Sequence, residues 1–201
     1  MSVAILVTPI AKKIPKVEKA VYIGVDAGSL QIINQNLPIA FAVGDFDSMG
    51  QEDFLNLQKK TECIQHPIQK DETDSELAIR LASKKGFDSI VLWGALSGRV
   101  DHTLANLRLL MYQFHNLVLM DETQKIFYLG PGKHKIANGY RHCSFFVVED
   151  AVVSLSGFLY NLESRAVDRK AIYMVSNGIV HEKADVIVHK GALLCIQSNE
   201  R

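Results

Sequence analysis

The sequence has few cysteines, and their pattern limits the class of protein. It contains three, Cys63, Cys143 and Cys195, which are widely separated and form no C-x-x-C pair. An odd and scattered set of this kind argues against a disulfide framework and against a structural zinc site. We therefore expect a protein of a reducing compartment, the cytoplasm.

Long hydrophobic runs and an excess of charge of one sign are also missing. No stretch approaches the ~20 apolar residues of a membrane span, and the apolar start Met1–Ile10 is short and has no basic leader. Lys plus Arg equals Asp plus Glu at 22 each, so no net positive field draws the chain toward nucleic acid or an anionic membrane. We expect a soluble intracellular protein that binds neither nucleic acid nor membranes.

The first part of the chain, residues 1–121, predicts an α/β domain. Short β-branched runs alternate with amphipathic segments, which is typical of a mostly parallel sheet flanked by helices. Two helices are expected directly after acidic clusters, over Asp74–Lys85 and Asp101–His115, the first with a capping box at Thr73 and a stop at Gly86. The expected strands are almost continuously apolar, as strands covered on both faces are: Val3–Val7, Val21–Val25, Ile39–Val43, Glu62–Gln65, Ser89–Trp93 and Leu117–Met120.

The second part, residues 122–201, has a different texture. Short apolar runs are separated by Gly, Asn, Asp and Pro turns, which is typical of an all-β domain. The sequence thus predicts a small antiparallel β-sandwich after a boundary near Asp121–Thr123. Its expected strands are Lys125–Leu129, Ser144–Val148, Val152–Leu155, Ala171–Val175, Asp185–Val188 and Ala192–Ile196.

Carboxylates gather at or just after the ends of the expected parallel strands. The carboxyl ends of such strands meet at one edge of a sheet, so we expect these acids to converge on a single crevice. Clustered carboxylates repel one another unless a cation lies between them, and oxygen ligands favour Mg²⁺ or Mn²⁺ over zinc. One such acid alone would be read as a helix cap or turn residue, but the set favours a metal and polyphosphate site: Asp26, Asp45, Asp47, Asp71, Asp74 and Asp101.

Two pairs within this set have informative spacing. Asp45 and Asp47 are two residues apart, so in an extended backbone both would face one side while Phe46 points into apolar packing. Asp71 and Asp74 are three apart at a helix start, close enough to share one ion if the turn is helical. Both pairs are therefore candidate metal ligands.

Cationic and neutral residues beside the acids are candidates for binding phosphate. Arg99 can grip two oxygens at once, and Lys70 supplies a point charge. No Walker loop is present, so phosphate binding would depend on the metal, Arg99 and Lys70. His102 and Asn106 are further candidates, with a hydrogen-bonded surface position as the alternative for His102 and a cap or packing role for Asn106.

The order and spacing of these segments closely resemble the thiamine pyrophosphokinase family over nearly the whole chain. The resemblance rests on Asp26–Gly28, Gly44–Ser48, Lys70–Ala78, Gly94–His102, Gly157–Leu162 and Val175–Asn177. It implies transfer of the terminal diphosphate of ATP to the hydroxyethyl group of thiamine, with release of AMP. It also implies a homodimer in which the α/β domain handles ATP and the β-sandwich helps to hold thiamine.

The resemblance further assigns roles to residues. Asp45, Asp47, Asp71 and Asp74 would form the metal and phosphate group, while Lys70 and Arg99 would contact phosphate. Asp26 would lie near the nucleotide, and Asp101 and Ser176 near thiamine, with Asn177 as a second neutral hydrogen-bonding group. The proton of the attacking hydroxyl would pass to Asp101 or Asp71, between which the sequence does not choose.

Two departures from the family pattern stand out. Ala27 stands where the family usually has Gly. The segment Gly178–His181 lacks the aromatic residue that covers thiamine in some members, and Tyr160 or Phe158 would have to substitute for it.

Two other functions compete with the transfer reaction. One is a metal-dependent nucleotide pyrophosphohydrolase, which would use the same acids to activate water. The other is a non-catalytic nucleotide or thiamine sensor.

Overall fold

The computed structural model describes residues 2–69 and 71–199, and the chain divides into two compact units. The first comprises Met1–Leu109 with Asn116–Glu122, and the second comprises Leu110–His115 with Thr123–Arg201. Within the described residues, no helix is both long enough and apolar enough to cross a membrane.

The first unit contains a parallel sheet with the strand order β6-β5-β1-β2-β3-β4. The central strand β1 has Ala4, Ile5, Leu6 and Val7 at most 2% exposed, because both of its faces are covered. All six expected strands are confirmed, with β3 one residue longer than expected: β1 (Val3–Val7), β2 (Val21–Val25), β3 (Ile39–Gly44), β4 (Glu62–Gln65), β5 (Ser89–Trp93) and β6 (Leu117–Met120).

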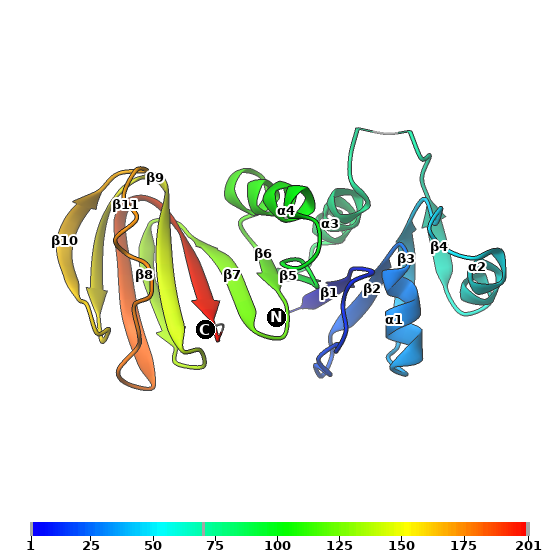
Figure 1. Cartoon of the computed structure of the whole chain (residues 1–201), viewed down its shortest axis with the longest axis horizontal. Helices are drawn as coiled ribbons and strands as arrows, with labels where there is room; N and C mark the ends of the chain where they lie inside the picture. Colours follow the sequence, from blue (N-terminus) through cyan, green and yellow to red (C-terminus); the bar gives the residue numbers. More distant parts are fainter. Residues whose placement is uncertain (1, 70, 200–201) are drawn as a thin grey trace. The chain divides into compact units, whose positions relative to one another are not determined.

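Helices cover both faces of this sheet. α1 (Gly28–Asn34) and α2 (Gln51–Gln58) lie on one face, and α3 (Asp74–Lys84) and α4 (Val100–Tyr112) lie on the other (Figure 1). The expected start of α3 is confirmed, because the Thr73 hydroxyl accepts a hydrogen bond of 3.1 Å from the backbone N–H of Glu76. The α/β fold class predicted for this part is therefore confirmed.

The strand order creates a reversal at the centre of the sheet. From β1 the chain proceeds outward through β2, β3 and β4, and α3 then carries it back to β5 on the other side of β1. The connections after β1 and β5 therefore leave the sheet in opposite directions. In open α/β sheets the ligand crevice forms at this kind of reversal, outside the carboxyl ends of the two strands.

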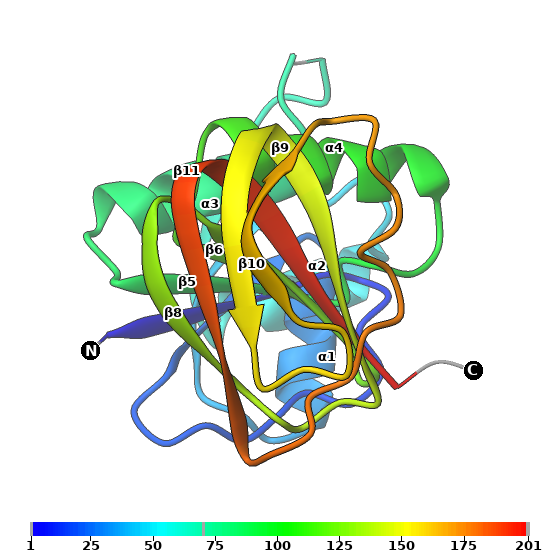
Figure 2. The same ribbon diagram turned by 90° about the vertical axis from the view of Figure 1, so that its left-hand side faces the viewer.

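The second unit is an antiparallel β structure built on two long strands. β9 (His142–Ser156) and β11 (Lys183–Ser198) pair along their length, and β10 (Leu162–Val167) pairs with β9. The first half of β11 also pairs with β8 (Gly132–Ala137), which lies beside it in Figure 2. The second half of β11 pairs with β7 (Gln124–Leu129). The predicted antiparallel, sandwich-like fold class is confirmed, with Phe145 packed edge-to-face on Phe158 in the core.

Several strand predictions for this unit were wrong in detail. The two runs expected as separate strands around residues 144–155 form the single strand β9, and those expected around 185–196 form β11. Ala171–Val175 is not a strand, since it begins with a turn in which the Ala171 N–H donates to the Asp168 carbonyl. β8 and β10 were not expected, because most of their residues are exposed and half of them are polar.

A glycine allows β11 to bend where its partners change. Register shifts interrupt its pairing with β9 between Val188 and Leu193, and Gly191 lies there with a φ of 76°. A Cβ added at Gly191 would lie 2.3 Å from the carbonyl oxygen of Asp150. The bend therefore requires a residue without a side chain.

We predict that Gly191→Ala destabilises the second unit by about 2–3 kcal/mol, because the alanine would combine backbone strain with a steric clash. Gly139→Ala is the matched control, since nothing lies within 4 Å of a Cβ added there, and it should change stability by less than about 0.5 kcal/mol. Urea unfolding followed by far-UV circular dichroism measures both. Equal midpoints for the two variants would show that the bend tolerates a side chain.

Candidate functional site

A pocket of about 250 Å³ lies at the reversal between β1 and β5. It is formed within the first unit by the loop after β1, the end of β2, the start of α3, and the loop that joins β5 to α4 together with the first two turns of α4. The lining residues lie in Thr8–Ile10, Val25–Asp26, Thr73–Ser75, Gly94–Arg99 and at positions 102 and 106. Five residues predicted from the sequence line it: Asp26, Asp74, Arg99, His102 and Asn106.

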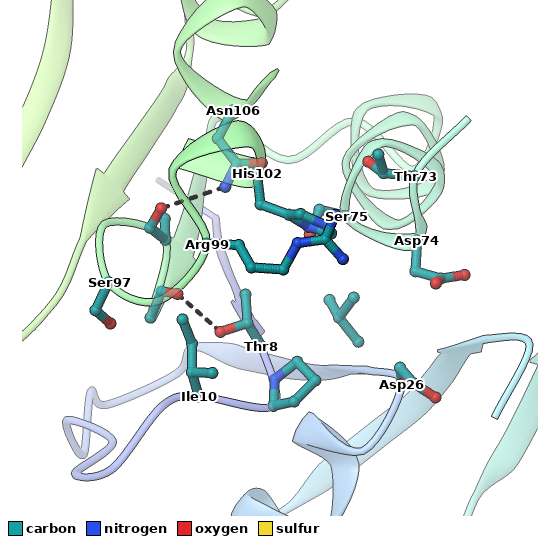
Figure 3. Close-up of a pocket in the computed structure, with 14 residues that line it drawn as sticks. Thr8, Ile10, Asp26, Thr73, Asp74, Ser75, Ser97, Arg99, His102 and Asn106 are labelled. Atoms are coloured by element: carbon teal, nitrogen blue, oxygen red, sulfur yellow. Dashed lines mark hydrogen bonds between the residues drawn. The ribbon is translucent and has the colours of Figure 1, made fainter. Parts of the chain in front are cut away.

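Opposite charges face one another across this pocket. Figure 3 shows Arg99 and His102 reaching from the start of α4 toward Asp74 and Ser75 at the start of α3, while Asp26 lies at the far side. The first turn of a helix presents backbone N–H groups, and Arg99 presents a planar donor group. The pocket therefore offers donors for phosphate oxygens beside carboxylates that suit a cation.

Asp26 occupies a strained backbone position. Its φ is 48°, a left-handed conformation that is uncommon for residues other than Gly. The Ser48 hydroxyl donates a 2.7 Å hydrogen bond to its Oδ2, whereas the buried Oδ1 has no hydrogen-bond partner among the described residues. Strain at a pocket-lining residue, together with an unsatisfied carboxylate oxygen, supports a ligand-binding role.

Asp45 and Asp47 lie in a turn next to Asp26. The extended backbone considered for this segment is wrong, because Phe46 has a φ of 59° and the Asp47 N–H donates to Asp45 Oδ1 at 3.2 Å. The placement of Phe46 in apolar packing is confirmed, as its ring is buried against Phe54. The negative charge of Asp45 raises the pKa of Asp47, with smaller effects from desolvation and from the charge of Asp26.

The predicted metal ligands do not form a complete metal site by themselves. Within residues 2–69 and 71–199, no group of three or more His, Cys, Asp or Glu side chains is arranged to hold an ion. Asp71 is exposed ahead of α3 and does not line the pocket, and Lys70 lies outside the described residues. The mutual repulsion of Asp45, Asp47 and Asp26 nevertheless fits a cation, since a positive charge beside them would relieve it.

Arg99 is held by a neighbouring carboxylate. Its Nε and Nη2 donate to Asp101 Oδ1 and Oδ2 at 3.1 and 2.5 Å, and both side chains are exposed. This bidentate hydrogen bond is the main reason why the pKa of Asp101 falls to about 2. Asp101 is therefore a weak proton acceptor while Arg99 remains bound to it.

The candidate thiamine-side residues belong to the second unit. Asn177 is buried, and its Oδ1 accepts hydrogen bonds from the N–H groups of Tyr160 and Gly178 while its Nδ2 donates to the Tyr160 carbonyl. Ser176 has a φ of 60°, and its N–H donates to the Ser144 hydroxyl. The Asn177 side chain therefore holds the backbone of Tyr160 in place. The position of Asn177 in the sequence did not reveal this role.

The two aromatic residues considered for covering thiamine differ in exposure. Phe158 is 2% exposed and packs against Phe145 in the core, so it has no free face for a ligand. Tyr160 is 70% exposed and lines a shallow pocket with Tyr173. Of the two, only Tyr160 is available for stacking.

Sequence reasoning missed the contribution of the loop after β1. Thr8, Pro9 and Ile10 line the pocket, although no charged group or motif marks them. The one available signal was their position after an apolar strand, the same signal that identified Asp26 and Asp45.

We predict that Arg99→Gln raises the pKa of Asp101 from about 2 toward its ordinary value of 3.8, because the donor that stabilises the carboxylate is removed. The depressed pKa means that this ion pair is formed above pH 4 and is lost as the pH falls toward 2. Carboxyl carbon NMR shifts at pH 3.5 should show Asp101 ionised in the wild type and partly protonated in the variant. The same ionisation in both would contradict the assigned cause.

Comparison with known proteins gives consistent matches for both parts of the chain. The profile of the thiamin pyrophosphokinase catalytic domain matches residues 16–120, and that of the thiamin pyrophosphokinase vitamin B1 binding domain matches residues 133–193. A thiamine pyrophosphokinase of Bacillus subtilis (strain 168) is 28% identical over 191 residues, which cover 91% of this chain and 89% of that protein.

Solved structures agree with the sequence matches. The crystal structure of thiamine pyrophosphokinase from Bacillus subtilis has a TM-score of 0.88 at 28% identity and covers 100% of both chains. That of a thiamin pyrophosphokinase family protein from Enterococcus faecalis has a TM-score of 0.87 at 27% identity, covering 100% of this chain and 99% of that one. Because the catalytic-domain profile spans residues 16–120 of 201, more than half of the sequence, the chain belongs to the thiamine pyrophosphokinase family.

Proposed function

We propose that this protein transfers the terminal diphosphate of ATP to the hydroxyethyl group of thiamine, forming thiamine diphosphate and AMP. The observation that carries the proposal is the pocket at the β1/β5 reversal, where Arg99 and His102 face Asp26 and Asp74. Membership of the thiamine pyrophosphokinase family supports it. In this proposal residues 1–121 bind ATP and residues 122–201 contribute to binding thiamine.

The first unit supplies the groups for the nucleotide. Arg99 binds phosphate oxygens through its planar donors, and His102 and Asn106 contribute hydrogen bonds from the same helix. Asp26 accepts hydrogen bonds from the nucleotide through its unsatisfied Oδ1. Lys70, proposed as a second phosphate contact, lies outside the described residues.

Asp45, Asp47, Asp71 and Asp74 are the residues that would hold Mg²⁺, with Mn²⁺ as the alternative. The raised pKa of Asp47 supports a cation beside it, since its neighbours Asp45 and Asp26 add negative charge. Carboxylate oxygens are the ligands that such hard ions prefer. When bound, the ion neutralises phosphate charge in the transition state.

The reaction is an in-line displacement. The hydroxyl oxygen of thiamine forms a bond to the β-phosphorus of ATP, the bond from that phosphorus to the bridging α,β-oxygen breaks, and AMP leaves with the oxygen. The hydroxyl proton passes to Asp101 or Asp71. Asp101 becomes a better proton acceptor when Arg99 leaves it for phosphate, because the hydrogen bonds from Arg99 are the main reason why its pKa is low.

The second unit supplies groups for thiamine. The exposed ring of Tyr160 can stack on a cationic aromatic ligand, and Ser176 and Asn177 hold the neighbouring segment in a fixed conformation. The three free thiols, with the Sγ atoms of Cys143 and Cys195 only 3.6 Å apart, support a reducing location such as the cytoplasm.

A homodimer is part of the proposal. Two adjacent pairs of large side chains in the second unit are between 56% and 74% exposed: Leu159 and Tyr160, and Ile172 and Tyr173. Such exposure is unusual for large apolar side chains. A second copy of the chain would cover these side chains. Sedimentation velocity of the wild type and of Tyr173→Asp measures whether each protein forms a dimer. A wild-type protein that sediments as a monomer at micromolar concentration would contradict it.

The function is tested by incubating the purified protein with ATP, Mg²⁺ and thiamine. Equal amounts of AMP and thiamine diphosphate are expected, with no AMP in the absence of thiamine. Release of AMP and pyrophosphate without thiamine would instead identify a nucleotide pyrophosphohydrolase. Binding of ATP or thiamine without turnover would identify a sensor.

We predict that Asp47→Asn and Asp74→Asn each lower kcat on the order of 10²-fold at saturating Mg²⁺, because each removes a charged group from the metal and phosphate site. Asp53→Asn is the matched control, an exposed acid in the first turn of α2 that does not line the pocket. Binding of Mn²⁺, followed by electron paramagnetic resonance, should weaken in the two site variants and not in the control. Near-normal turnover and Mn²⁺ binding in both site variants would contradict their role.

A further inference from the structure

The loop that delivers Arg99 to the pocket is held by hydrogen bonds to its first two carbonyl groups. This loop, Gly94–Arg99, joins β5 to α4 and lines the pocket. Its first two N–H groups, those of Gly94 and Ala95, donate to the Met120 carbonyl at 2.8 and 3.3 Å, as an extension of the sheet. The carbonyls of Gly94 and Ala95 accept hydrogen bonds from side chains instead.

Thr8 supplies the first of these side chains. Its hydroxyl donates to the Gly94 carbonyl at 2.9 Å, and its N–H donates to the Trp93 carbonyl at 3.1 Å. Thr8 is 6% exposed, and a Cβ added at Gly94 would lie 2.5 Å from its hydroxyl oxygen. The start of the loop is thus packed directly on Thr8.

Asn106 supplies the second. It is 6% exposed on α4, and its Nδ2 donates to the Ala95 carbonyl at 3.3 Å, as drawn in Figure 3. The two bonds come from opposite sides of the loop, one from the end of β1 and one from α4. Gly94 and Ala95 are buried, and both hydrogen bonds lie in the interior, where loss of a donor leaves a desolvated carbonyl.

We infer that Thr8 is a positioning residue for the transfer reaction, which acts on Arg99 through the loop Gly94–Arg99. Its hydroxyl extends the pairing of β1 with β5 by one residue into the loop, next to the backbone hydrogen bond from the Thr8 N–H to the Trp93 carbonyl at the reversal of the sheet. Without the hydroxyl, the loop keeps its sheet bonds but loses the bond to the Gly94 carbonyl, so the position of Arg99 becomes less well defined. This inference rests on the proposed function of the same pocket.

The test compares Thr8→Val, which removes the hydroxyl and keeps the shape, with Thr8→Ser, which keeps the hydroxyl. Thr8→Val should lower kcat on the order of tenfold, with KM for ATP and thiamine within about threefold, because misplacement of a charge-stabilising group affects the transition state most. In Thr8→Ser, which keeps the hydroxyl, kcat should stay within about twofold of the wild-type value. The control is Thr61→Val, since the buried Thr61 hydroxyl has no hydrogen-bond partner among the described residues.

A second measurement does not depend on activity. Amide hydrogen exchange of a peptide that covers Gly94–Arg99 should be faster in Thr8→Val than in the wild type, and unchanged in Thr8→Ser and Thr61→Val. If Thr8→Val does not fold, Thr8→Ala removes the same hydroxyl without a branched replacement and takes its place.

The outcomes separate the two proposals. A wild type that makes no thiamine diphosphate contradicts the proposed function, while the exchange measurement still decides whether Thr8 holds the loop. An active wild type with equal kcat in Thr8→Val, or with equal losses in Thr8→Val and Thr8→Ser, overturns the positioning role. Unchanged exchange in the loop of Thr8→Val overturns it as well.

Discussion

The site depends on the divergence of the chain on either side of β1. Because β2 and β5 flank the same strand and their onward connections run in opposite directions, no crossover covers the carboxyl ends of β1 and β5. The loops that follow these strands, the end of β2 and the starts of α3 and α4 line this gap, and a pocket of about 250 Å³ lies between them. Asp26, Asp74 and Arg99 line one pocket for this reason, although they are far apart in the sequence.

Electrostatics and backbone strain around the pocket point in the same direction. The charges of Asp45 and Asp26 raise the pKa of Asp47, so the three carboxylates lie close enough to repel one another. Selection for stability alone would not favour such a cluster. Asp26 and Phe46 both adopt positive φ angles that glycine would adopt more easily. At Phe46 the conformation buries the ring while the acids on either side stay near Asp26, so the strain has an identifiable structural result.

The sequence predicts the parallel sheet better than the antiparallel unit, and the reason is physical. Strands covered on both faces must be apolar throughout, so β1, β2, β3, β5 and β6 are visible as short apolar runs, whereas the edge strand β4 has exposed polar residues at both ends. β8 and β10 expose most of their side chains and carry polar residues, which leaves no such signal. The reverse error occurs at Ala171–Val175, where Ile172 and Tyr173 are apolar but 74% and 56% exposed, so the run suggests a buried strand where none exists.

The same distinction explains which site residues could be found. Asp26, Asp74 and Arg99 carry chemistry that is recognisable from the residue type and from the position at the end of a strand or the start of a helix. Thr8 does not, because its role depends on the pairing of β1 with β5, and its partner Gly94 is 86 residues away. Local pattern gives each strand but not its neighbours. A residue whose function is to join two neighbouring strands therefore becomes visible only when the strand order is known, whereas a residue that meets the ligand itself is visible earlier.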